Sequence, residues 1–146
     1  MKTTLVATAA LILMLNAPVT ARAGDRPFRA SGVATLEGDP FAGTAYDLDG
    51  TATHLGAFTG RGHVQFFHVD GTLASQGTTT FVAANGDELY ASFLAFQEAG
   101  SAEFVGLFIF EGGTGRFAGA EGLAIVVATP LGDTSFLIQI AGTIDY

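Results

Sequence analysis

Few side chains in this sequence could carry out chemistry. The only histidines are His54, His63 and His68, and the chain has no cysteine. Because His63 and His68 differ by five positions, they would point to opposite faces of one strand and could not chelate one metal ion. We therefore expect no metal site and no other cofactor, and we expect His54 to hydrogen-bond the backbone and fix a bend. Without cysteine, disulfides and thiol chemistry are excluded.

Two polar residues next to or within apolar runs are the best candidates for a site. Glu103 precedes the uncharged run FVGLFIF, and Tyr90 lies in the run LYASFLAF. A carboxyl or phenol that points into a protein interior has a perturbed pKa or a fixed hydrogen bond, which marks a candidate site. We therefore name Glu103, Tyr90 and His54 as candidate ligand-binding residues, and no catalytic residue. In the alternative interpretation, Glu103 lies at a solvated strand end and Tyr90 points outwards.

The densest cluster of glycines is EGGTGRFAGAEG at 111–122. Its spacing fits neither a phosphate-binding P-loop nor a dinucleotide-binding loop, and no helix is indicated after it. The flanking carboxylates of Glu111 and Glu121 would also repel a phosphate. This segment is therefore predicted to be a structural turn between two strands.

After residue 23 the sequence shows no helical periodicity and is typical of β-structure. Short runs rich in Phe, Val, Ile and Thr are separated by turns, and Asp70-Gly71 and Asn85-Gly86 are strong hairpin signals. Turns this short require antiparallel pairing. The expected strands are 27–35, 44–59 (with a kink near Gly50), 62–69, 76–83, 88–97, 103–110, 120–128 and 134–145.

The last three of these strands are apolar on both faces, for example Leu123, Ile125 and Val127 on one face and Ala124 and Val126 on the other. An antiparallel sheet with one solvated face would alternate apolar and polar residues. Closure into a barrel covers one face and removes the sheet edges. We therefore expect an all-β fold, a single eight-stranded antiparallel β-barrel. Its outer apolar face then needs another subunit, a lipid or a terminal segment, and a homo-oligomer is the ordinary solution.

Within the glycine-rich turn, each residue type has an expected role. Gly112, Gly113 and Gly115 permit a positive φ where the chain leaves a strand. Arg116 is expected to pair with one of the two flanking glutamates, and Phe117 to plug the end of the barrel.

Three segments of the sequence resemble a known group of barrels. GGTGRFAGAEG at 112–122 resembles a turn of allene oxide cyclase-like and dirigent-like barrels, and of small exported bacterial proteins related to them. GTATHLGAFTG at 50–60 and ANGDELYA at 84–91 resemble the same bacterial group. The resemblance implies an eight-stranded barrel with a central cavity, commonly trimeric in the plant relatives. The resemblance assigns no catalytic residue to this sequence, because the catalytic residues of the plant enzymes lie outside the three matched segments.

The amino terminus resembles an export signal. Lys2 is followed by an apolar run from Leu5 to Leu15 and by Ala21-Arg22-Ala23, the pattern of a secretory signal peptide. We expect residues 1–23 to be a signal peptide and 24–146 to be the barrel domain, with cleavage after Ala23 or, alternatively, after Ala21. The expected location is periplasmic or extracellular.

Charge excludes some partners. Four positive side chains would remain in the processed chain against 14 acids, a formal charge of −10. Nucleic acid and anionic lipid head groups should repel such a chain, and we expect no membrane insertion.

Three functions remain open from the sequence. The first is binding of an apolar small molecule inside the barrel, or a role as an oligomeric interaction module, without catalysis. The second is an isomerase or cyclase of the allene oxide cyclase type, which would hold an apolar substrate in one conformation. The third is a small outer-membrane barrel, which alternating apolar residues up to Tyr146 favour, whereas the absence of tryptophan disfavours it.

Overall fold

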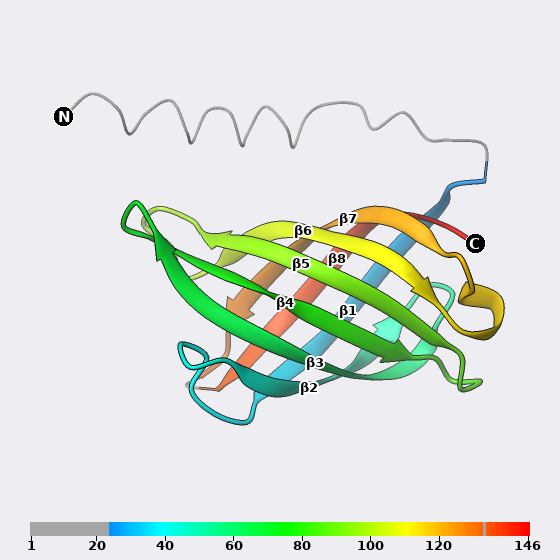
Figure 1. Ribbon diagram of the computed structural model, residues 1–146, viewed down its shortest axis with the longest axis horizontal. Coiled ribbons are helices and arrows are strands. Elements are labelled where there is room, and N and C mark those ends of the chain that lie inside the picture. Colours follow the sequence, from blue (N-terminus) through cyan, green and yellow to red (C-terminus); the bar gives the residue numbers. More distant parts are fainter. Residues whose placement is uncertain (1–23, 133) are drawn as a thin grey trace.

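The chain folds into a closed antiparallel β-barrel (Figure 1). The computed structural model describes residues 24–132 and 134–146, so the predicted signal peptide at 1–23 lies outside the described residues. Each strand pairs with the next one along the chain, and β8 pairs with β1 to close the ring. The elements are β1 (Arg26–Leu36), β2 (Thr44–Ala52), β3 (Gly56–Val69), β4 (Thr72–Val82), β5 (Glu88–Gln97), β6 (Phe104–Gly113), the 3-10 helix η1 (Gly115–Phe117), β7 (Glu121–Pro130) and β8 (Ser135–Asp145).

The predicted all-β, eight-stranded barrel is therefore confirmed, and both hairpin signals mark real turns. Asp70 and Gly71 both have a positive φ between β3 and β4, at 48° and 81°. Gly86, with φ 89°, lies between β4 and β5. Two-residue turns with left-handed backbone match the twist of the strands that they join, which explains why these dipeptides predict hairpins so well.

The largest error in the predicted strand boundaries lies between β2 and β3, and β4 also begins at Thr72 rather than at residue 76. We expected one strand over 44–59 and the next to begin at residue 62, but β2 ends at Ala52 and β3 begins at Gly56. The turn lies around His54, whose φ is 69°. Gly60 and Arg61, which we expected to separate two strands, lie within β3, as does Gly62. A Cβ atom on Gly62 would come within 2.1 Å of the Thr78 carbonyl oxygen, so this glycine permits close packing rather than a turn.

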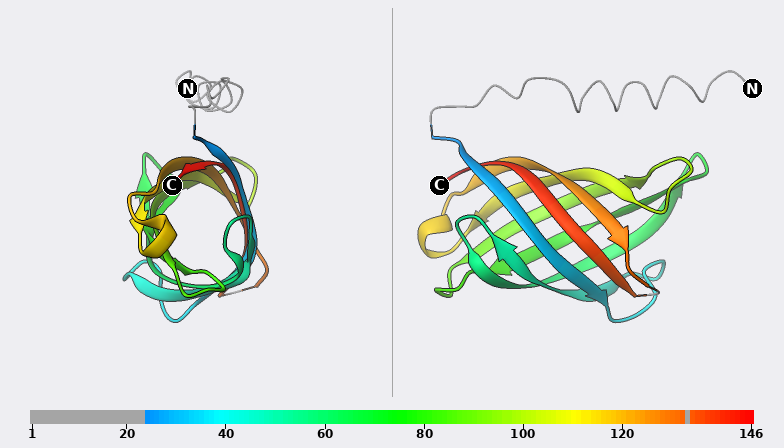
Figure 2. Two further views of the ribbon diagram at one scale, coloured as in Figure 1. Left: turned by 90° about the vertical axis from the view of Figure 1, so that its right-hand side faces the viewer. Right: turned by 180° about the vertical axis from the view of Figure 1, so that it is seen from behind.

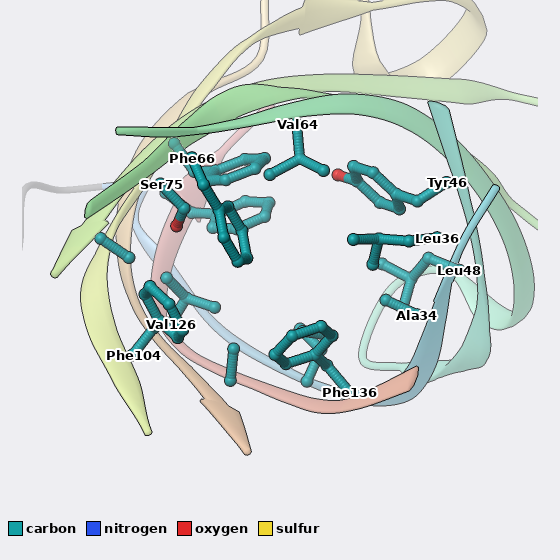
Figure 3. A pocket seen from close by; sticks show the side chains of 15 residues that line it. Ala34, Leu36, Tyr46, Leu48, Val64, Phe66, Ser75, Phe104, Val126 and Phe136 are labelled. Carbon is teal, nitrogen blue, oxygen red and sulfur yellow. The ribbon is translucent and has the colours of Figure 1, made fainter. Parts of the chain in front are cut away.

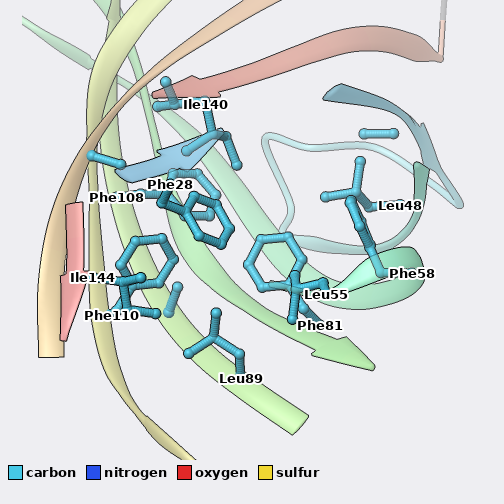
Figure 4. Close-up of a cluster of buried hydrophobic side chains, with 14 of the residues drawn as sticks. Phe28, Leu48, Leu55, Phe58, Phe81, Leu89, Phe108, Phe110, Ile140 and Ile144 are labelled. Carbon is cyan, nitrogen blue, oxygen red and sulfur yellow. The ribbon is translucent and has the colours of Figure 1, made fainter. Parts of the chain in front are cut away.

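One end of the barrel interior is filled with large apolar side chains. At this end, which we call the packed end, lie both ends of the described chain and the connections that contain His54, Gly86 and η1. Figure 2 shows η1 at this end of the ring of strands. Figure 4 shows the side chains that pack together there. They include fully buried Phe28, Phe81, Leu55, Leu89 and Ile144.

The other end of the barrel is less completely filled. We call it the cavity end, and the connections 37–43, 70–71 and 98–103 lie there, together with residues 131, 132 and 134. A cavity remains between the rings at this end, whereas at the packed end the Phe28 and Phe110 ring centres are 4.7 Å apart. Phe66 lies 5.2 Å from Phe104 and 6.4 Å from Phe136. The interior is thus filled at the packed end and incompletely filled at the cavity end.

The outer surface of the barrel also has two halves. Outward positions of β2 and β3 carry Asp47, Asp49, Arg61 and His63, whereas outward positions in the middle of β5 to β7 are mostly apolar. The register places Leu94 opposite Leu107 and Leu107 opposite Ile125, and a second row joins Ile109 to Leu123. Four of these side chains are exposed: Leu94, Leu107, Ile109 and Leu123. The expectation that the last three strands are apolar on both faces therefore holds for the middle of β6 and β7, whereas the outward positions of β8 include Ser135, Gln139 and Thr143.

Candidate ligand-binding cavity

The incompletely filled half of the barrel contains a cavity with a volume of about 70 Å³ (Figure 3). Apart from Tyr46 and Ser75, the side chains that line it are alanine, valine, leucine, isoleucine or phenylalanine. An engineered cavity of about 150 Å³ lined by such residues stays dry and binds benzene or xenon. This cavity is roughly half that size, so without movement it holds a short alkyl segment or part of one small ring.

The cavity exists because small residues face large ones across the barrel. Ala34, Ala95 and Ala128 project inwards from β1, β5 and β7, where a larger side chain would meet the rings on the opposite wall. Inward positions nearer the packed end include larger side chains such as Phe28, Phe81 and Leu89, which leave little space. Alternation of small and large residues on inward positions is thus what leaves room for a ligand.

Tyr46 is the larger of the two polar side chains on the cavity wall, and its hydroxyl is already engaged. It donates a hydrogen bond to the Thr78 carbonyl oxygen at 3.1 Å and also contacts the hydroxyl of Thr79, which is itself buried. Burial raises the pKa of Tyr46 to about 12, and the Thr79 hydrogen bond lowers it only in part. Tyr46 is therefore neutral at physiological pH, and its hydrogen bonds with Thr78 and Thr79 hold its side chain in place on the cavity wall.

Ser75 is the other polar side chain, and its situation differs. It is 6 % exposed, and Figure 3 shows its side chain on the wall of the cavity, next to Phe66. Among residues 24–132 and 134–146 no group hydrogen-bonds to its hydroxyl, and the oxygen is not one of the fully covered side-chain atoms, so it is accessible from the cavity. Ser75 is thus the polar group on this wall that is free to bind a ligand.

The three residues that the sequence singled out do not line this cavity. His54 lies in the β2–β3 turn at the packed end, where its Nε2 donates to the Pro27 carbonyl oxygen at 2.9 Å. This matches its expected role in fixing a bend. Its ring also contacts that of Tyr146, with 5.6 Å between the ring centres.

Tyr90 and Glu103 both lie outside the barrel, so the condition that made them candidates is not met. The Tyr90 hydroxyl donates to Glu88 at 2.7 Å, and this hydrogen bond raises the pKa of the exposed phenol. Glu103 accepts a hydrogen bond from Thr129 at 3.0 Å, next to the outward face of β7. Strand parity explains the result, since Leu89 and Phe104 are the inward neighbours. Ligand binding by these residues stays an untested prediction.

The glycine-rich turn has the predicted structural role, with one correction. Gly112 and Gly115 have positive φ values of 101° and 56°. Gly113, in contrast, is needed for space, because a Cβ atom there would lie 2.0 Å from the Glu88 carbonyl oxygen. Phe117 is 0 % exposed and packs against Tyr146 with 4.9 Å between ring centres, so it plugs the packed end as expected.

We expected Arg116 to pair with Glu111 or Glu121, but it pairs with neither. Its Nε lies 3.7 Å from Asp87, and its guanidinium donates to the His54 carbonyl oxygen. Glu111 and Glu121 face each other across β6 and β7, and Glu111 instead accepts a hydrogen bond from Ser92. The turn is therefore anchored to the neighbouring connections of the packed end rather than to its own flanks.

The described residues contain neither a cluster of metal-ligating side chains nor a membrane-spanning helix. No group of three or more His, Cys, Asp or Glu residues within 24–132 and 134–146 is arranged to hold a metal ion. No helix in the same residues is both long enough and apolar enough to cross a membrane.

Comparison with known proteins adds no family: no family model matches the chain, and no curated protein matches it either. The resemblance to allene oxide cyclase-like and dirigent-like barrels stays a prediction that rests on the three segments quoted above. The class of protein is defined by the fold, a small closed β-barrel with an apolar cavity near one end.

Proposed function

We propose that this protein is an exported barrel that binds a small apolar molecule inside its cavity end. The observation that carries the proposal is the composition of the cavity wall, which is made of hydrocarbon side chains except for two hydroxyls. Apolar walls with one or two placed polar groups are typical of small-molecule sites. Export is part of the proposal because of the predicted signal peptide.

Binding is better supported than isomerisation. A cyclase or isomerase can act by holding an apolar substrate in one conformation, but it also benefits from a group that stabilises charge in the transition state. The side chains on this cavity wall include no carboxylate, histidine or arginine, and the Tyr46 hydroxyl is bonded to Thr78 and Thr79. The arrangement therefore favours a binding role over catalysis.

The charges on the outer surface also favour a barrel that works in water. Outward positions at the middle of β2 and β3 carry Asp47, Asp49 and Arg61. In an outer-membrane barrel these positions would face lipid, where charged side chains are costly. Its interior would be polar, whereas this interior contains phenylalanine and leucine.

Filling the cavity should abolish binding while keeping the fold. Ala128 lies on the cavity wall, and Ala128→Leu adds three carbon atoms to a space of about 70 Å³. We expect at least a tenfold loss in affinity for 1-octanol, measured by amide NMR titration, with stability unchanged or raised by about 1 kcal/mol.

The matched control is Ala57→Leu, which adds the same atoms at an exposed outward position of β3. It should leave 1-octanol affinity as in the wild type. Equal affinity of the Ala128→Leu variant and the wild type would contradict binding in the cavity.

We also propose that two or more copies associate through the apolar outer face of β5 to β7. Leu107, 46 % exposed, lies at the centre of this face, between Leu94 and Ile125 of the neighbouring strands. The chain is strongly acidic, so like-charged copies repel one another where charges face each other. The middle of this face carries no charge, which makes it the surface on which a second copy is accepted at the lowest electrostatic cost.

Sedimentation velocity tests this association. The wild-type chain should sediment as an oligomer at micromolar concentration, and Leu107→Asp should convert it to monomer because it places carboxylates in the interface. Thr78→Asp, on the polar outer half of the barrel, adds the same charge and should leave the oligomer intact. A monomeric wild type would refute the proposal.

A further inference from the structure

We propose that the cavity selects a short-chain molecule that has one hydrogen-bonding group and no negative charge, and that this group binds Ser75. The inference rests on the proposed function, since it assumes that a ligand occupies the barrel, and it specifies the chemical class of that ligand. Two independent features carry it, the free hydroxyl of Ser75 and the acidic side chains around the cavity end.

Ser75 lies near the mouth of the cavity rather than at its base. It is the fourth residue of β4, which begins at the cavity end with Thr72. Its strand neighbours in register are Phe66 and Ala95, which also line the cavity. A ligand whose polar group binds the Ser75 hydroxyl therefore directs its apolar part towards Phe93 and Phe108, which lie further from the cavity end along β5 and β6.

The Ser75 hydroxyl can satisfy one polar group on the part of the ligand that is buried in the cavity. This hydroxyl can donate one hydrogen bond and accept others, and no described residue forms a hydrogen bond with it. Tyr46, the other polar side chain of the wall, is engaged by Thr78 and Thr79. A second polar group on the buried part of the ligand would therefore face carbon, at a cost in free energy.

The connections at the cavity end carry a concentration of negative charge. Asp39, Asp70, Glu98 and Glu103 lie in or next to these connections, as does Glu37. Arg61 pairs with Glu37 at 2.9 Å and partly neutralises it. The other basic side chains of the described chain are Arg26, Arg29 and Arg116, which belong to the packed end.

This charge distribution disfavours an anionic ligand. A ligand anchored at Ser75 has its polar end towards the mouth, within the field of these carboxylates. A carboxylate there is repelled, whereas a hydroxyl is not affected and an ammonium group is attracted. Long-chain acids are therefore poor ligands, and alcohols, ketones and amines of short chain length are suitable ones.

Three probes with the same tail test the selection: 1-octanol, octylamine and octanoate at neutral pH. Amide NMR titration of the full chain should show octanol and octylamine shifting Ser75 and Ala95 resonances, with octanoate at least tenfold weaker at low ionic strength. Salt screens exposed charges, so the difference should shrink to about threefold or less in molar salt. Equal affinity for octanoate and octanol at low ionic strength would overturn the charge selection.

One single variant tests the Ser75 anchor, and two double variants test the charge selection. Ser75→Ala should weaken octanol binding by about three- to tenfold, the range expected for loss of one neutral hydrogen bond, and leave the binding of xenon unchanged. Asp39→Asn with Glu98→Gln should tighten octanoate binding several-fold. The same charge change at the packed end, Glu121→Gln with Asp145→Asn, should leave octanoate binding unchanged. Unchanged octanol affinity in Ser75→Ala would refute the anchor.

Failure of the inference is distinguishable from failure of the proposed function. If neither xenon nor octanol shifts the resonances of the cavity residues, no ligand enters the barrel and both proposals fail. If xenon and octanol bind but octanoate binds equally well, the cavity is a binding site without the selection proposed for it.

Discussion

Phe117→Ala should be among the most destabilising single substitutions in this barrel, lowering the free energy of unfolding by about 3–5 kcal/mol. Phe117 is fully buried in η1 and closes the packed end against the ring of Tyr146. The guanidinium of Arg116 also lies 4.8 Å from the centre of its ring. Alanine would leave a cavity and open this end to water, because the short connection that carries it cannot collapse into the barrel. Urea unfolding followed by circular dichroism measures the loss.

Phe41→Ala is the matched control for this experiment. Phe41 is 51 % exposed in the β1–β2 connection and makes edge and stacking contacts with Phe66 and His68. Its removal should cost about 1 kcal/mol or less, since little apolar area leaves the interior. Similar losses for the two variants would show that Phe117 does not act as the plug of the packed end.

Alkaline pH should destabilise the protein through one tyrosine. Burial raises the pKa of Tyr46 from its ordinary value of 10.0 to about 12. Below pH 10 both folded and unfolded chains keep the phenol neutral, so its contribution to stability is complete. As the pH rises from 10 towards 12, the unfolded chain ionises first and stability falls, in total by about 3 kcal/mol.

The composition of the chain makes this effect unusually easy to isolate. Lys2 is the only lysine, so above pH 10 few side chains other than the three tyrosines titrate. Unfolding by urea at a series of pH values measures the slope, and Tyr46→Phe should remove most of it. That variant should also cost about 1 kcal/mol at neutral pH, because the hydroxyl of Thr79 loses its partner. An unchanged slope in Tyr46→Phe would refute the assignment.

The fold could be predicted from sequence because its signals are local. Asp70-Gly71 and Asn85-Gly86 specify tight turns within a few residues, and runs that are apolar on both faces require closure. The β2–β3 boundary could not be predicted in the same way. Gly60 and Gly62 look like turn residues, but they are required by contacts with the neighbouring strands, such as that of Gly62 with Thr78 and Tyr46.

The candidate site could not be predicted, because inward and outward faces are assigned by register. A shift of one residue exchanges the faces, so Tyr90 and Glu103 were as plausible as Ser75 until Phe104 and Leu89 were placed inside. A serine between Ala74 and Gln76 has no sequence signal of its own. The partner of Arg116 was missed for a similar reason, since Asp87 approaches it only when two separate connections meet at the packed end.

A crystal structure determined under xenon pressure would test the central claim most directly, that the barrel holds an apolar molecule. Xenon is apolar and scatters strongly, and apolar protein cavities bind it. We predict a xenon atom inside the barrel at the cavity end, among Ser75, Phe104 and Val126. Xenon found only against the outer face of β5 to β7, with none inside the barrel, would contradict the account.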